Sequence, residues 1–299
     1  MRIIYSHVHF PSKNFLGEGW KEDKRMKIES KWLDKEREKW SLAWRFPPME
    51  KIEDQDKLIQ LWYEETVKYE LNKIVFVTGG GNENLLNIVN SHPDKFLGYC
   101  HHNPEEENAA DILKKYIGKG LKGYKILAPK VDTIISDKKF YPIWETAQSL
   151  DIPILWHFGI MGGAGGLSNH VNINPMVFHN VAKDFPRLKF IIPHFGCGYV
   201  FETLQLCWTC PNIYIDTSGS NQWMRWMPYE LNLEILFRKY YETIGPERII
   251  FGTDSSWFGR GFSEKYLNEQ MRSMVYVGYK PDEIDMVLYK NIADILKLD

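Results

Sequence analysis

The hydrophobic positions of this chain fall in short runs rich in β-branched and aromatic residues, and stretches with helical spacing separate these runs. Continuous apolar runs of this length predict strands that are covered on both faces, as in a parallel sheet. The predicted strands are 2–8, 73–78, 96–101, 120–127, 152–157, 189–194, 212–217 and 248–253. The predicted helices are 54–70, 82–91, 104–117, 138–150, 174–185, 199–208, 229–244, 263–277 and 281–298.

Eight alternating strand and helix units within 299 residues predict an α/β fold, specifically a (β/α)8 TIM barrel. A doubly wound open sheet is the alternative architecture. We expect residues 1–299 to form a single domain.

Two predicted connections are longer than ordinary loops. Residues 11–50 follow the first strand and carry Trp20, Trp32, Trp40 and Trp44 among charges of balanced sign. Because the loops after barrel strands build the catalytic face, we expect a lid-like helical insertion here; a solvated surface helix with buried tryptophans is the alternative. Residues 158–174 are rich in glycine but match no phosphate-binding motif, and we expect a mobile loop.

Composition excludes several classes of partner. Lys and Arg total 37 against 39 Asp and Glu, so the formal charge is −2 and no basic surface for nucleic acid is expected. The four cysteines are too few for a disulfide scaffold of this size, and no apolar run is long enough to span a membrane. These features predict a cytoplasmic protein with a small-molecule partner. The Cys207–Cys210 pair precedes the seventh strand, so we expect it at the end of the barrel opposite the chemistry.

Polar side chains gather where the predicted strands end. His7 and His9 are two residues apart, so in a strand they point to the same face. Because barrel enzymes keep their chemistry at these ends, and burying unused polar groups is costly, the set predicts a site rather than isolated structural histidines. Imidazole and carboxylate ligands suit Zn, Fe or Mn. The residues concerned are His7, His9, Lys125, His157, His194 and Asp254.

Sequence pieces around these residues resemble a known family. They are "HVH", "GYKILAP", "PILWHFG", "FPRLKFIIPHFGCG", "NIYIDTSG", "GPERIIFGTDSSW" and "YKNIADIL", in this order along nearly the whole chain. The chain is similar to the amidohydrolase superfamily, and within it to the amidohydrolase-related branch. That branch includes aminocarboxymuconate-semialdehyde decarboxylase and related aromatic-acid decarboxylases, hydratases and lactonases.

The resemblance implies a role for each residue. It implies that His7, His9, His157 and Asp254 bind one divalent metal, with Zn expected first and Mn or Fe as alternatives. It also implies that His194 acts as acid or base and that Asp254 shares the proton transfer. The chemistry agrees, because a divalent metal lowers the pKa of its water to ~7.

Lys125 leaves three interpretations open. In binuclear relatives a lysine at this strand is carboxylated and bridges two metals. In a mononuclear site Lys125 would lie in or near the pocket and bind a substrate carboxylate, or it would only brace the barrel. The chain also departs from many relatives, which carry a histidine soon after this lysine where this chain reads "KILAP".

Further candidates surround the predicted pocket. We expect His170, Trp223 and Arg225 to contact an acidic or aromatic substrate. His101 and His102 end the third strand on the same face, where one of them would line the pocket or both would be loop histidines. We expect Asp216 to hold a hydrogen-bond network with Ser218 under the site.

Three functions fit this pattern. The favoured one is a metal-dependent hydrolase that activates water for attack on a small ester, lactone or amide. The closest alternative is non-oxidative decarboxylation of an unsaturated or aromatic carboxylic acid at the same site. The third is a non-catalytic barrel that binds a metal or ligand. The resemblance also implies a possible homodimer.

Overall fold

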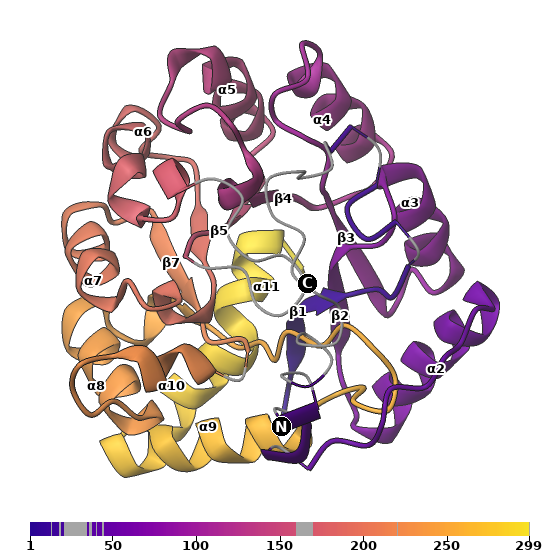
Figure 1. The fold of residues 1–299 in the computed structure, drawn as a ribbon, viewed down its shortest axis with the longest axis vertical. Helices are drawn as coiled ribbons and strands as arrows, with labels where there is room; N and C mark the ends of the chain where they lie inside the picture. Colours follow the sequence, from indigo (N-terminus) through magenta and orange to yellow (C-terminus); the bar gives the residue numbers. More distant parts are fainter. Residues whose placement is uncertain are drawn as a thin grey trace.

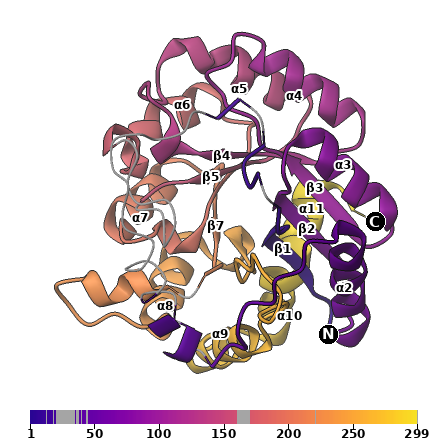
Figure 2. The same cartoon turned by 45° about the vertical axis from the view of Figure 1, so that its right-hand side comes forward.

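The eight strands form one parallel sheet in sequential order, and helices surround them (Figures 1 and 2). The computed structural model describes residues 1–12, 14–17, 19–20, 35, 38–39, 41–43, 45–159, 170–219 and 221–298, with only the backbone of His170. The order β1 to β8 confirms the barrel over the doubly wound alternative. The strands are β1 (Ile4–His9), β2 (Lys73–Thr78), β3 (Phe96–Cys100), β4 (Gly123–Leu127), β5 (Ile154–His157), β6 (Phe190–Ile192), β7 (Ile213–Asp216) and β8 (Ile249–Ile250).

The helices follow the strands in sequence and form the outer layer. Several begin at side-chain caps, as where the Asp54 carboxylate accepts hydrogen bonds from the first turn of α2. None of the helices in the described part of the chain is long and apolar enough to cross a membrane. The helices are α2 (Gln55–Lys68), α3 (Asn82–Ser91), α4 (Ala109–Gly118), α5 (Tyr141–Ser149), α6 (His179–Asp184), α7 (Val200–Thr209), α8 (Leu233–Ile244), α9 (Glu264–Val277), α10 (Pro281–Asp285) and α11 (Asn291–Leu296).

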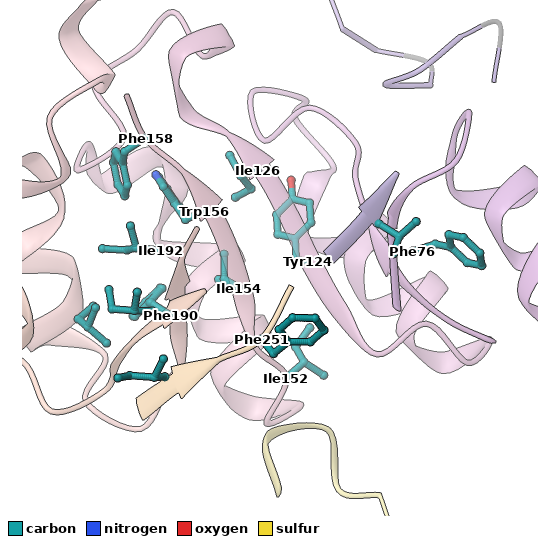
Figure 3. Packing of buried hydrophobic residues seen from close by; sticks show 14 of the residues in the cluster. Phe76, Tyr124, Ile126, Ile152, Ile154, Trp156, Phe158, Phe190, Ile192 and Phe251 are labelled. Carbon is teal, nitrogen blue, oxygen red and sulfur yellow. The ribbon is translucent and has the colours of Figure 1, made fainter. Parts of the chain in front are cut away.

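Aromatic side chains fill the layer between strands and helices (Figure 3). The ring centroids of Trp144 on α5 and Trp156 on β5 lie 5.1 Å apart, and Phe178 packs edge-on to Phe190 at 4.4 Å. Burial of such rings is a major apolar contribution to stability. This layer fixes each strand against its own helix.

A second, smaller cluster fills the lower interior of the barrel. Strand residues at alternate positions, such as Val75 and Val77, belong to one cluster with apolar residues of α11, which contacts β1 and β8 and lies across the centre of the ring of strands in Figure 1. The floor is therefore closed by hydrocarbon, and inward-facing polar side chains are left at the carboxyl ends of the strands. This cluster comprises Ile4, Val75, Val77, Leu97, Tyr99, Leu155, Ile191, Ile250, Ile292, Ala293, Ile295 and Leu296.

Closure of the barrel depends on residues beyond the last strand. β8 is shorter than the predicted 248–253, and the chain after it completes the pairing with β1. Asp254 N donates to His7 O at 3.1 Å, and His9 N donates to Ser255 O at 2.8 Å. The closing contacts therefore place Asp254 beside both histidines of β1.

The predicted helix 281–298 is divided by a π turn, η8 (Met286–Lys290). This turn accepts a hydrogen bond from the segment that follows the last strand. Phe251 N donates to Val287 O at 2.9 Å, inside this turn. The buried Asn291 amide then donates to Pro246 O and Ile249 O, both at 2.7 Å. Backbone groups that the short β8 leaves without a strand partner are satisfied in this way.

We predict that Asn291→Ala lowers the free energy of unfolding by about 2 kcal/mol, because it removes both hydrogen bonds that the buried amide donates, although Pro246 O still accepts one from Ile249 N. Urea denaturation of the metal-free protein measures this change. Asn268→Ala on the exposed side of α9 is the matched control and should change stability by less than about 0.5 kcal/mol. Equal effects of the two substitutions would contradict this role for Asn291.

Candidate active site

The carboxyl ends of β1 and β8 bring three metal-ligating side chains together. The ligand atoms of His7, His9 and Asp254 all lie within 4.8 Å of one another. Asp254 Oδ1 is 3.6 Å from His7 Nε2 and 3.2 Å from His9 Nε2. The structure thus places the two histidines of β1 on one face, as their spacing predicts.

Hydrogen bonds behind the histidines orient their rings. His7 Nδ1 donates to Asp216 Oδ2 at 2.5 Å, so its Nε2 carries a lone pair directed at the site. His9 Nδ1 likewise donates to Thr78 Oγ1 at 2.7 Å, which leaves the lone pair of His9 on Nε2. His7 Nε2 is buried and has no hydrogen-bond partner among the described residues. A buried imidazole nitrogen of this kind is what a metal ligand requires.

His157 and His194 extend the site across the barrel. His157 ends β5 outside the group of three, and its ring centroid is 5.2 Å from that of His194. Within the described chain, His157 Nε2 is buried without a hydrogen-bond partner. His194 Nδ1 donates to Ser218 O at 3.0 Å, so Nε2 is the basic nitrogen of this tautomer. The His7 and His194 ring centroids also lie 5.2 Å apart.

The network predicted under the site is present. Ser218 N donates to Asp216 Oδ1 at 2.5 Å, and Ser218 Oγ lies 3.1 Å from His7 Nδ1 and 2.9 Å from His194 Nδ1. Burial raises the pKa of Asp216 to about 6, and the nearby His194 and Ser218 oppose this rise. Asp216 and Ser218 therefore connect two histidines on opposite sides of the site.

The electrostatics favour neutral imidazoles and an ionised carboxylate. Burial, reinforced by nearby cationic groups, lowers the pKa of His7 and His157 well below the usual value, and burial also lowers that of His9. Burial alone would raise the pKa of Asp254, but the neighbouring His194, His9 and His7 outweigh it and hold the pKa well below its usual range. Neutral imidazole and ionised carboxylate are the protonation states that bind a metal, so these residues fit a divalent cation.

Lys125 projects from β4 and is 1% exposed. Burial lowers the pKa of its ammonium to about 8, although Asp254 and Asp216 oppose the shift. Its charge lowers the pKa of both His7 and His157, which places it close to the candidate ligands. Lys125 is thus a buried amine whose charge acts directly on the site.

The structure gives local partners for Trp223 and Arg225, two of the other predicted substrate contacts. Trp223 and Arg225 belong to a short 3-10 helix, η6 (Gln222–Trp226). Trp223 is buried and its indole donates to Asn221 Oδ1, whereas Arg225 is exposed with its guanidinium 5.7 Å from the Trp226 ring centroid. The side chain of His170 lies outside the described residues.

His101 and His102 serve the backbone. His101 Nε2 accepts hydrogen bonds from Gly79 N at 3.3 Å and Gly81 N at 2.9 Å, and His102 Nε2 donates to Ala109 O at 2.9 Å. Both rings hold loops in place through these bonds.

Cys207, one of the two cysteines predicted to be structural, is buried. Burial raises the pKa of its thiol to about 12, as expected of a structural cysteine.

The described parts of the long first loop lie beside the site. The Phe15 ring centroid is 4.8 Å from that of His9, and the Trp20 indole donates to His101 O at 2.9 Å. Trp32, Trp40 and Trp44 of the predicted lid, and residues 160–169 of the predicted mobile loop 158–174, lie outside the described residues. Sequence patterns did not single out Phe15, Thr78 or Arg260, because none of them stands at a recurring motif position.

Comparison with known proteins supports the same fold. A sequence model of the family described as Amidohydrolase matches residues 4–298. No curated protein sequence matches the chain. An uncharacterized TIM-barrel protein from Bordetella bronchiseptica aligns at a TM-score of 0.69 with 18% identity, covering 99% of each chain.

Two further solved structures align over nearly their full length. A probable 2-pyrone-4,6-dicarboxylic acid hydrolase from Acinetobacter baumannii, with citric acid bound, has a TM-score of 0.63, 14% identity and 100% coverage of both chains. A 5-carboxyvanillate decarboxylase from Novosphingobium aromaticivorans, complexed with manganese and a nitrobenzoic acid, has a TM-score of 0.60 and 12% identity. The alignment covers 96% of the decarboxylase chain and 99% of this chain.

We predict that Lys125→Met stabilises the metal-free protein at pH 7 by about 3 kcal/mol, because the pKa of the buried ammonium falls from 10.5 to about 8 on folding. The unfolded chain binds more protons between these two values, so the gain should shrink as the pH rises from 8 to 10. Urea denaturation across this range measures it, with the exposed Lys122→Met as control. A gain that is absent, or independent of pH, would contradict the buried charge.

Proposed function

The chain belongs to the amidohydrolase family, and on that basis we propose that it is a metal-dependent hydrolase acting on a small ester, lactone or amide. The observation that carries the proposal is the convergence of His7 Nε2, His9 Nε2 and the Asp254 carboxylate beside the basic nitrogen of His194. The third possibility, a non-catalytic barrel, is set aside because the chain belongs to a family of enzymes.

We assign His7, His9, His157 and Asp254 as ligands of one divalent ion. Two of these residues present buried imidazole nitrogens that have no partner in the described part of the chain. Oxygen and imidazole donors without thiolate suit Zn²⁺ and Mn²⁺ alike, and manganese is bound by the decarboxylase from Novosphingobium aromaticivorans. Zn²⁺ remains the first candidate, with Mn²⁺ second and Fe²⁺ third.

The protein groups then divide the proton transfers. A bound divalent ion supplies Lewis acidity, which lowers the pKa of water and polarises a carbonyl group. The ionised Asp254 accepts a proton from the attacking water and returns it to the leaving oxygen or nitrogen. His194 is held by its hydrogen bond to Ser218 O, which directs Nε2 at the site. In its protonated form, His194 stabilises the negative charge that develops on the carbonyl oxygen of the substrate.

Lys125 supports decarboxylation as the second candidate function. A buried ammonium next to the ligands offers a counter-ion for a substrate carboxylate, and Phe15 beside His9 offers a ring face for a planar substrate. In this reaction the bond to the carboxyl carbon breaks, CO₂ leaves, and the electron pair stays on the substrate carbon. Asp254 or His194 then protonates that carbon. In either reaction, we expect a substrate with a carboxylate group.

Further parts of the proposal concern the whole chain. We propose one domain over residues 1–299, with residues 11–50 as the lid. All four cysteines are free, which supports a cytoplasmic location. We also propose a homodimer, which sedimentation velocity of the purified protein tests.

We predict about one divalent ion per chain in protein purified without added metal, and less than about 0.1 in the His7→Ala/His9→Ala variant. Elemental analysis measures both. His179→Ala on α6 is the matched control and should keep the full metal content. Two ions per chain would instead support Lys125 as a carboxylated bridge, and no metal in any sample, even after titration, would overturn the assignment.

We predict that Asp254→Asn lowers kcat by about 10³-fold or more, because an amide cannot accept and return the proton. The wild-type protein is first screened with carboxylated lactones and esters, scored by acid release, and with hydroxylated benzoates, scored by CO₂ release. Turnover in the first panel supports hydrolysis, and turnover only in the second supports the alternative. Activity of Asp254→Asn within a factor of ten of wild type would remove Asp254 from the chemistry.

A further inference from the structure

Arg260 is a buried cation whose guanidinium bonds the backbone around Asp254. It is 7% exposed, Nη1 donates to Asp254 O at 2.9 Å, and Nη2 donates to Thr253 O. These two carbonyl groups belong to the peptide planes on either side of the Asp254 Cα atom. One side chain therefore restrains both φ and ψ of the candidate ligand.

Asp254 needs such a restraint. Its φ is +59°, in the left-handed region that side-chain-bearing residues rarely adopt, at a cost of about 1–2 kcal/mol. The backbone conformation sets the direction of the side chain, and in this conformation Asp254 Oδ1 lies 3.6 Å from His7 Nε2 and 3.2 Å from His9 Nε2. A relaxed backbone at this residue would move the carboxylate away from the two imidazoles.

Three aromatic rings hold the guanidinium in place. The Arg260 Cζ atom lies 5.1 Å from the ring centroids of Phe46, Trp257 and Tyr266. Such contacts favour a cation by about 1–2 kcal/mol each when water is excluded. Because Phe46 lies near the end of the long first loop and Trp257 and Tyr266 follow β8, this aromatic box joins segments from both ends of the chain.

The same part of the first loop is fastened to the loop after β8. Glu50 N donates to Phe258 O at 2.9 Å. Gly259 has a φ of +79° and lies against Pro48, where a Cβ atom would come within 2.4 Å of the Pro48 carbonyl oxygen. Only glycine permits this close approach, so residues 46–50 and 257–260 form one packed unit.

We propose that Arg260 is a positioning residue for Asp254, and that Phe46 links the end of the first loop to it through the aromatic box. The inference rests on the proposed role of Asp254 as metal ligand and proton carrier. The two hydrogen bonds from its terminal nitrogens go to the Thr253 and Asp254 carbonyl groups, so Arg260 acts on the site through the backbone of Asp254.

The chain offers a matched control for this idea. Arg248 also donates to backbone carbonyls, those of Cys207, Cys210 and Ile213, but it does so beneath the barrel, away from the site. Substitution of Arg248 therefore measures how much stability is lost when an arginine that bonds backbone carbonyl groups is removed away from the site. Any effect specific to Arg260 must come from its position beside Asp254.

The test measures the dissociation constant of Zn²⁺ by chelator competition, together with the thermal midpoint, for Arg260→Lys and Arg248→Lys. A lysine ammonium is a single point charge and cannot span two carbonyl groups. We expect Arg260→Lys to weaken Zn²⁺ binding by about 10- to 100-fold, the range typical of residues that orient ligands, and to lower kcat. Arg248→Lys should lower the thermal midpoint and leave Zn²⁺ binding within about twofold of wild type.

Chemical rescue separates positioning from general stability. Guanidinium chloride at millimolar concentration should restore part of the Zn²⁺ affinity of Arg260→Ala, and sodium chloride at the same ionic strength should not. If Arg260→Ala does not fold, Phe46→Leu is the milder variant that tests the same contact. It should fold, and it should weaken Zn²⁺ binding by about threefold to tenfold.

The outcomes distinguish this inference from the proposed function. If wild type binds Zn²⁺ and the Arg260 and Arg248 variants bind it equally well, positioning by Arg260 is overturned while the metal site stands. If wild type binds neither Zn²⁺ nor Mn²⁺, the proposed function itself fails.

Discussion

The hydrogen bonds between β1 and the residues after β8 hold both the barrel and the candidate site together. β8 is only Ile249–Ile250, so the barrel closes through Asp254 N to His7 O and His9 N to Ser255 O. Three of the four residues that close the sheet, His7, His9 and Asp254, are therefore also candidate ligands. Stability and chemistry are coupled here, because a shift at this seam would separate Asp254 from both histidines.

Around this seam, the protein places charges where an apolar interior would disfavour them. Burial keeps His7 and His157 neutral, whereas the nearby His194 and the hydrogen bond with His9 keep Asp254 ionised. Lys125 is destabilising by the same physics, since its pKa falls to about 8. A divalent ion and an anionic substrate would complement these groups, which is why we favour carboxylated substrates for either reaction.

Strand periodicity was enough to predict the fold. All eight predicted strands are present in the predicted order, because parallel strands covered on both faces leave long apolar runs. Helix and strand ends were less accurate: α4 begins at Ala109 instead of residue 104, and the last helix is divided by η8. Such ends depend on backbone hydrogen bonds to distant segments, as Phe251 N to Val287 O illustrates.

The sequence by itself determined the barrel, the strand-end position of each candidate ligand and the paired direction of His7 and His9, because these depend only on local periodicity. Tertiary structure alone decided how the side chains are held. Asp216 behind His7 and Phe46 against the Arg260 guanidinium join residues remote in sequence, and Arg260 in turn restrains the left-handed backbone of Asp254. No local pattern encodes such contacts, since they arise only when the barrel closes and packs.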